Sequence, residues 1–298
     1  MRIANKTLYD NIVQKLGRVT TDLMDAHEVV NTTKKINELS DDPVGLVTVL
    51  NLKSSLENIN QMERNISLGK SWITAGETAL SQVQDILSQT KELCVQMSSA
   101  NVNPTERANA MSVVDGQLRQ ILSLANTQAG GRYIYSGTNT ETIPFAFNGT
   151  ETQVLYSGND AAFSIMTSKD TNIEIGRDGE DIFGDNWDDN NIFKTLIDLK
   201  THLQDDNVPE IQAAMNKLDA HLTTIRGAVS NGAGKMIRLN VREEIIQDLQ
   251  LTYTNRTAEL EEADITEAIM NLNAKELAYN AALNSASKVM KLSLVDYV

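Results

Sequence analysis

The chain has few of the residues that interrupt helices or cross-link loops. Its 298 residues include a single cysteine and only four prolines, at positions 43, 104, 144 and 209. One cysteine excludes an intramolecular disulfide framework and any zinc site built from several thiolates. Because Met1 to Asp42 and Glu210 to Val298 contain no proline, long uninterrupted helices are possible near both ends of the sequence.

Long apolar runs are also missing. No segment approaches the ~18 consecutive apolar residues that a membrane span needs. The opening stretch, MRIANKTLYDNIVQKLG, alternates charged with apolar residues and lacks the apolar core of a signal peptide. We therefore expect no membrane insertion, and we expect that any export uses a route without a cleaved hydrophobic signal.

Positive charge is scarce in the middle of the chain. The net charge of −14 argues against nonspecific binding of nucleic acid. Positions 141–190 hold eleven acidic residues against Lys169 and Arg177, whereas positions 265–298 hold three acidic and three basic residues. The middle is therefore suited to solvent, and the C-terminal stretch can approach other copies without repulsion.

A heptad pattern dominates the first half of the chain, where apolar or small residues alternate in steps of three and four. These seam positions are Ile59, Met62, Ile66, Gly69, Ile73, Gly76, Leu80, Val83, Leu87, Thr90, Cys94 and Met97. The spacing predicts a coiled-coil helix of roughly 60 Å, and it makes Cys94 a small buried residue rather than a reactive thiol. Asn103 and Pro104 then fit the N-cap and first position of a second helix.

The residue composition changes between Gly130 and Phe193. This segment holds nine of the fourteen aromatic residues and eight of the sixteen glycines. Alternation in RYIYSG, PFAFNG, TQVLYSG and AAFSIM predicts short strands joined by tight turns. The fold class is therefore mainly α, a long coiled-coil helical rod with a small β-rich insertion in the middle. The expected segments are an N-terminal helix (1–40), a first rod half (41–130), the insertion (131–190), a second rod half (191–260) and a C-terminal helix (261–298).

Both terminal segments predict amphipathic helices with one apolar face. The N-terminal seam consists of Ile12, Leu16, Val19, Leu23, Ala26 and Val30. The C-terminal seam consists of Ile265, Ile269, Leu272, Tyr279, Leu283, Ala286, Met290 and Leu294. Burying such a seam contributes ~10 to 20 kcal/mol, less than the roughly 35 to 70 kcal/mol of backbone entropy lost on ordering the helix. We therefore expect the ends to be largely disordered in the free monomer and to fold when neighbouring subunits cover them.

The stretch NELSDDPVG separates the N-terminal helix from the rod. Asp42 is placed to cap a helix whose first residue is Pro43, and Ser40 is the alternative cap. Carboxylates such as Asp41 and Asp42 suit the positive end of a helix. We interpret Ser40, Asp41, Asp42 and Pro43 as a joint between an assembly-dependent helix and a self-folding rod.

No catalytic or cofactor motif appears. The histidines His27, His202 and His221 fall in different helices, and we expect them on polar surfaces. NGAGKMIRLN lacks the glycine and hydroxyl spacing of a phosphate loop. The many carboxylates of DGEDIFGDNWDDNN raise the question of whether this stretch binds calcium. It does not match a calcium-loop pattern, so it is better interpreted as a solvated acidic surface. We expect no enzyme, no cofactor and no metal site.

Several stretches together resemble one family. They are SDDP after the first helix, NISLGKSWITAGETALSQVQDILSQTKELCVQ, LANTQAGGRYIYSGTNTETIPF, GRDGEDIF and the closing ITEAIMNLNAKELAYNAALNSASKVMKLSLVDYV. In this order they resemble the family of flagellar hook-associated protein 3, the hook–filament junction proteins related to flagellin. The family usually carries a glycine followed by lysine or arginine shortly before SDDP, whereas VVNTTKKINEL has no glycine.

The resemblance implies a secreted, extracellular part of the bacterial flagellum. It implies terminal helices that pack as a coiled coil in an inner tube, the rod helices in the next shell and the insertion facing outward. It implies type III export with a chaperone on the C-terminal region, and assembly of a ring of copies between hook-associated protein 1 and flagellin. Two alternatives are a flagellin filament subunit and a secreted coiled-coil translocator that acts on host membranes.

Overall fold

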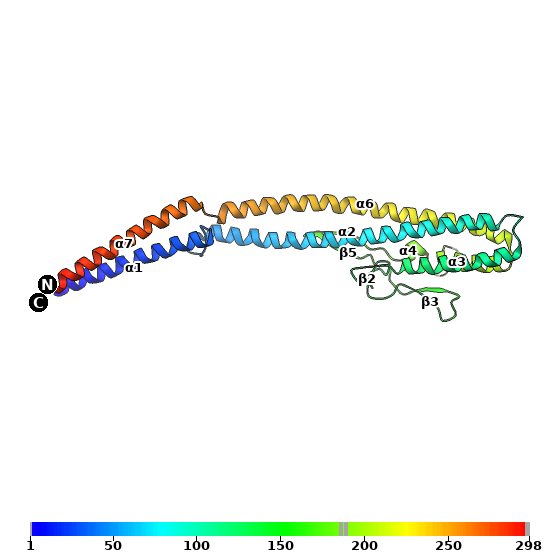
Figure 1. Cartoon of the computed structure of the whole chain (residues 1–298), viewed down its shortest axis with the longest axis horizontal. Coiled ribbons are helices and arrows are strands. Elements are labelled where there is room, and N and C mark those ends of the chain that lie inside the picture. The colour runs from blue at the N-terminus through cyan, green and yellow to red at the C-terminus, as the bar shows by residue number, and fades with distance from the viewer. Residues whose placement is uncertain (1, 185–186, 188–189, 296–298) are drawn as a thin grey trace. The chain divides into compact units, whose positions relative to one another are not determined.

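Helices make up most of the computed structural model, which describes residues 2–184, 187 and 190–295; side chains are not described for residues 2–6, 8 and 289–295. The long helices are α1 (Arg2–Thr32), α2 (Pro43–Met97), α3 (Pro104–Ala125), α6 (Val208–Glu261) and α7 (Ile265–Val295), with the shorter α4 (Glu180–Phe183) and α5 (Ile192–Gln204) (Figure 1). Six short strands lie between α3 and α4 among the described residues: β1 (Gln128–Ala129), β2 (Arg132–Tyr133), β3 (Phe145–Phe147), β4 (Val154–Tyr156), β5 (Ser164–Ser168) and β6 (Thr171–Glu174). This confirms the predicted fold class.

Helix α3 begins where its sequence signals predict. The Asn103 side chain accepts a hydrogen bond from the Glu106 backbone N–H at 2.9 Å. The Glu106 carboxylate accepts one from the Asn103 N–H at 3.1 Å, which completes a capping box with Pro104 in the first turn. The predicted cap is confirmed.

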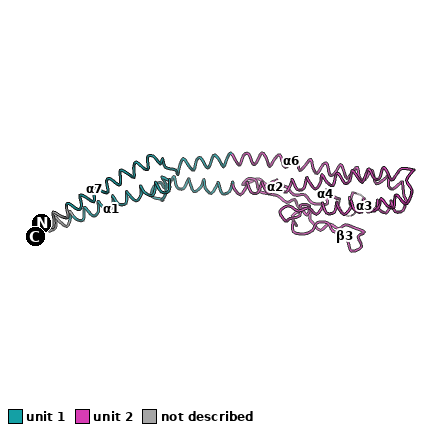
Figure 2. The backbone as a smooth tube through the Cα atoms, viewed as in Figure 1, with its two compact units in different colours: residues 1–59, 248–298 teal, residues 60–247 magenta. Residues whose placement is uncertain are grey.

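The chain divides into two compact units. Unit 1 contains residues 1–59 and 248–298, and unit 2 contains residues 60–247 (Figure 2). Helices α2 and α6 each contribute to both units.

Unit 2 is a helical bundle with the insertion attached. The predicted seam of α2 supplies much of its core, since Ile66, Val83 and Leu87 have no measurable exposure. Helix α3 packs most closely against α5. An ion pair between Lys91 and Asp219, with N···O distances of 2.6 and 2.8 Å, joins α2 to α6.

The insertion is built from three antiparallel hairpins, β1 with β2, β3 with β4 and β5 with β6. Gly130 and Gly131 form the turn of the first hairpin with φ values of 59° and 79°, which glycine adopts at no steric cost. Phe193 of α5 lies 5.2 Å from Phe145 and 5.8 Å from Phe183, measured between ring centroids. Aromatic packing therefore attaches the insertion to the bundle.

In unit 1, α1 and α7 pack side by side in opposite directions (Figure 1). An ion pair between Lys275 and Asp22 at 2.9 Å crosses the pair. The fully buried apolar residues described in these two helices are alanines, namely Ala26, Ala268 and Ala286. No described helix has a stretch apolar and long enough to span a membrane.

Candidate assembly site

The predicted N-terminal seam lies along one face of α1. Ile12, Leu16, Val19, Leu23 and Val30 are all half-buried, and Ala26 between them is buried. Their partial burial follows from packing against a single partner helix, because one helix covers only part of such a stripe.

The predicted C-terminal seam divides into two faces in the folded chain. Leu272 and Tyr279 are half-buried and Ala286 is buried, as expected of the side that packs on α1. Three other members of the seam are exposed: Ile265 at 40%, Ile269 at 45% and Leu283 at 46%. The side chains of Met290 and Leu294 lie outside the described residues. Helix α7 therefore has an apolar surface beyond the one that α1 covers.

Further large apolar side chains of unit 1 are exposed. These side chains were not part of the predicted seams, and their exposures range from 51% to 77%. They are Tyr9, Val13 and Met24 of α1, Met270 and Leu277 of α7, and Val44, Val47 and Leu50 at the start of α2. Their positions off the main stripe explain why the heptad pattern missed them. Covering these side chains in an assembly would be favourable, because burial of apolar surface drives association.

The joint before α2 is held by aspartate side chains. Asp42 Oδ1 accepts hydrogen bonds from the backbone N–H groups of Val44 at 3.1 Å and Gly45 at 2.9 Å, the geometry of an N-cap. Ser40 instead donates to Glu38 Oε2 at 3.1 Å. Of the two alternatives, Asp42 is therefore the residue that caps the helix.

Asp41 closes the loop on its other side. Its Oδ2 accepts from the backbone N–H groups of Glu38 and Asn37, both at 2.9 Å, and these bonds lower the pKa of the Asp41 carboxyl. Gly45 has a role that the sequence did not indicate. A Cβ atom there would lie 2.2 Å from Asp42 Oδ2 and 2.9 Å from Ile36 Cδ1, so a larger residue would displace the cap.

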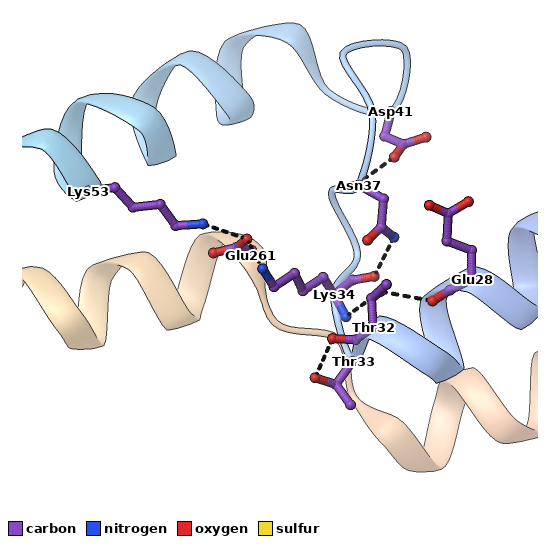
Figure 3. A network of polar contacts seen from close by, with 8 residues as sticks. All are labelled: Glu28, Thr32, Thr33, Lys34, Asn37, Asp41, Lys53 and Glu261. Atoms are coloured by element: carbon purple, nitrogen blue, oxygen red, sulfur yellow. Dashed lines mark hydrogen bonds and ion pairs between the residues drawn. The ribbon is translucent and has the colours of Figure 1, made fainter.

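A short antiparallel bridge ties this loop to the break between α6 and α7. The Lys35 N–H donates to the Glu261 carbonyl at 2.8 Å, and the Ala263 N–H donates to the Thr33 carbonyl at 3.0 Å. Beside the bridge, Glu261 Oε1 lies 2.7 Å from Lys34 Nζ and 2.8 Å from Lys53 Nζ (Figure 3). The loop between α1 and α2 and the loop between α6 and α7 are thereby connected.

Glu261 is well covered for a carboxylate, with a side-chain exposure of 12%. Burial by itself raises its pKa, but the hydrogen bonds to Lys34 and Lys53 outweigh burial and leave the pKa below the ordinary value. Sequence reasoning missed this cluster because Lys53 and Glu261 are 208 residues apart.

Thr33 lies in the stretch VVNTTKKINEL, which lacks the glycine expected shortly before SDDP. Its φ is +60°, in the left-handed region that a β-branched residue rarely adopts. Its Oγ1 donates to the Thr32 carbonyl at 2.6 Å, and its own carbonyl accepts from Ala263. The stretch without glycine therefore places a threonine where glycine would adopt the same φ freely.

One histidine differs from its prediction. His221 is only 4% exposed, and its Nε2 lies 2.9 Å from Thr195 Oγ1, so the expectation of a polar surface is wrong for this residue. It is buried because its face of α6 packs against α5. The side chain of His27 is half exposed. Cys94 is buried, and burial raises the pKa of its thiol to about 11, as suits an inert seam residue.

Within the acidic stretch DGEDIFGDNWDDNN, residues 185, 186, 188 and 189 lie outside the described residues. Within the described part of the chain, no group of three or more histidine, cysteine, aspartate or glutamate side chains is arranged to hold a metal ion.

Comparison with known proteins first defines a class. Residues 3–140 match the family model described as the bacterial flagellin N-terminal helical region. The fold is flagellin-like, and the class that the chain resembles consists of flagellin-related structural proteins of the bacterial flagellum, which are not enzymes.

Two relatives narrow the class further. Over 99% of its length and 98% of theirs, the chain is 24% identical to flagellar hook-associated protein 3 of Escherichia coli and 22% identical to that of Salmonella typhimurium. The resemblance to hook-associated protein 3 is confirmed.

Solved structures show the same fold. The hook-associated protein 3 structure from Legionella pneumophila superposes with a TM-score of 0.62 at 14% identity, covering 70% of this chain and 98% of that one. FlgL from Bacillus cereus superposes with a TM-score of 0.58 at 22% identity, covering 68% and 97% respectively.

Proposed function

We propose that this chain is a junction adaptor, which joins the flagellar hook to the flagellin filament by packing its terminal helices between neighbouring copies. The observation that carries the proposal is the second apolar face of α7, where Ile265, Ile269 and Leu283 stay between 40% and 46% exposed although α1 is in place. Covering a large aliphatic side chain contributes about 1.5 to 3 kcal/mol, so each such residue favours association.

The partners follow from the named relatives. The E. coli and Salmonella proteins are called flagellar hook-associated protein 3. On this basis the chain forms a ring of its own copies between hook-associated protein 1 and flagellin, outside the cell. A chaperone holds its C-terminal region before export. Neither nucleic acid nor a membrane is a partner.

The five segments take different roles in this proposal. Segments 1–40 and 261–298 form the inner tube, 41–130 and 191–260 form the rod, and 131–190 faces outward. The joint at Ser40, Asp41, Asp42 and Pro43 separates the inner tube from the rod. The acidic insertion supports an outer position because like charges are best tolerated in water.

Assembly in cells tests the proposal. In a strain that lacks this protein, we expect secreted flagellin monomer without filaments, and wild-type chain should restore the filaments. Ile269→Ser combined with Leu283→Ser should lower filament number several-fold, with the melting temperature of the monomer changed by less than about 3 °C.

A matched control is Leu155→Ser, which removes a side chain that is 51% exposed on the insertion. It should leave filament number unchanged. Equal filament numbers for the double variant and the control would contradict the proposal. If a strain that lacks the protein has complete hooks but secretes no flagellin, the chain is instead a flagellin subunit. If the monomer makes liposomes leak, the chain is instead a translocator.

A further inference from the structure

A small cavity lies within unit 2. It has a volume of about 40 Å³ and is lined by residues of α2, of α6 and of the insertion. The lining includes Trp72, Glu77, Tyr135, Arg177, Gly232 and Lys235. The cavity therefore lies where the insertion meets two of the long helices.

Two residues of the lining each carry a polar atom that is buried without a partner. Trp72 is 1% exposed, and its ring packs on Phe163 with centroids 5.0 Å apart. Its Nε1 has no hydrogen-bond partner among the described residues, and neither has the buried Oε1 of Glu77. A buried polar group left unpaired costs ~1 to 3 kcal/mol, so native proteins rarely keep two at one place.

The chemistry of these atoms selects the occupant. Trp72 Nε1–H is a donor only and the Glu77 carboxylate is an acceptor only, so the occupant must both accept and donate hydrogen bonds. An anion without an O–H group cannot donate to Glu77, and a metal ion cannot accept from Trp72. Water does both, and the cavity volume corresponds to about three water molecules.

The neighbouring residues keep this space open. A Cβ atom on Gly232 would lie 3.0 Å from Glu77 Oε1, so glycine at this position leaves room beside the carboxylate. The Tyr135 hydroxyl donates to the Gly76 carbonyl at 2.8 Å and closes the adjoining wall by direct contact. Lys235 supplies a half-buried ammonium group, and burial together with the nearby Arg177 lowers its pKa.

We propose that this cavity is an internal hydration site, in which water molecules bridge Trp72 Nε1 to Glu77 Oε1. The insertion then meets α2 and α6 partly through water, whereas direct aromatic packing attaches it to α5. The site is independent of assembly and is present in the monomer.

Magnetic relaxation dispersion of solvent nuclei, measured on the full-length monomer, counts long-lived internal waters. Glu77→Leu and Trp72→Phe should each lower that count by about one to three relative to wild type. The control Glu92→Leu changes an exposed glutamate of the same helix and should leave the count unchanged. An unchanged count in both cavity variants, with wild-type circular dichroism, would overturn the proposal.

A high-resolution crystal structure of the wild-type chain tests the site without any substitution. Water density within hydrogen-bond distance of both Trp72 Nε1 and Glu77 Oε1 is expected. A direct bond between the two atoms, or an organic molecule in the cavity, would contradict it. This measurement decides the matter even if a cavity variant fails to fold.

Discussion

Unit 2 and unit 1 are both built mainly from helices but bury them to different depths. In unit 2, Trp72, Phe183 and Leu196 are almost completely enclosed. In the terminal helices of unit 1, the fully enclosed residues described are alanines, while Ile265 and Leu283 stay partly in water. The difference lies in the number of neighbours, because a bundle surrounds each helix whereas a pair covers only one face.

The comparison teaches that an apolar stripe has a different meaning in each unit. In unit 2 the stripe of α2 is satisfied within one chain. In unit 1 the stripe of α7 is wider than its single partner, and additional copies of the chain are the proposed cover. The expectation that the ends fold only when covered stays a prediction.

The largest expected difference between the two units is the loss of unfolding free energy when a large apolar side chain is truncated. Phe193 has no exposure and packs on Phe145 and Phe183, so Phe193→Ala should lower the free energy of unfolding by about 3 to 5 kcal/mol. Leu283→Ala in unit 1 should cost less than about 1 kcal/mol, because the side chain is 46% exposed. Urea unfolding of the monomers measures both, and equal losses would remove the contrast between the units.

The joint before α2 should matter more for assembly than for the monomer. Replacing both Asp42 and Pro43 with alanine removes the two N–H···O bonds of the cap, which are worth about 1 kcal/mol together. Filament number in complemented cells should fall several-fold, while the urea midpoint of the monomer shifts only slightly. Proportionate losses in both measurements would refute the role of the joint in assembly.

The ion cluster of unit 1 should make its stability depend on pH. Because the pKa of Glu261 is lowered in the folded chain, the stabilisation is present above the unfolded value of 4.5 and is lost as pH falls through the lower folded value. Glu261→Gln should therefore reduce stability at pH 7, and the deficit relative to wild type should shrink as the pH falls below about 4.5. Helix content of unit 1 followed against urea at several pH values tests this, and a deficit independent of pH would count against the cluster.

The smallest expected effect concerns backbone strain. Thr33→Gly should raise the free energy of unfolding by up to about 1 kcal/mol, because glycine adopts a φ of +60° without the cost that threonine bears. Thr48→Gly, in the body of α2, is the control and should lower stability by roughly 0.5 kcal/mol. Thermal unfolding measures both, and a loss in the Thr33 variant would show that its φ is not strained.

Much of the fold was predictable because it depends on local pattern. The heptad spacing through Ile66 and Leu87 predicted a buried seam, and Asn103 with Pro104 predicted the start of α3. The exposure of Ile269 and the burial of His221 were not predictable, because each depends on which neighbouring helix covers that face. The helix cap by Asp42 was predictable from a sequence motif. The need for glycine at position 45 was not, because it depends on where the Ile36 side chain packs.

By itself the sequence determined that the chain forms long helices with apolar stripes around a short β-rich insertion, because periodicity and the positions of proline and glycine act over a few residues. Only the tertiary structure decided how those stripes are used. It placed Glu261 beside Lys34 and Lys53, required a left-handed threonine at the joint and divided the stripe of α7 into a covered and an open face. The physical reason is that burial and charge pairing depend on neighbours far along the chain, and a local pattern does not specify which neighbours these are.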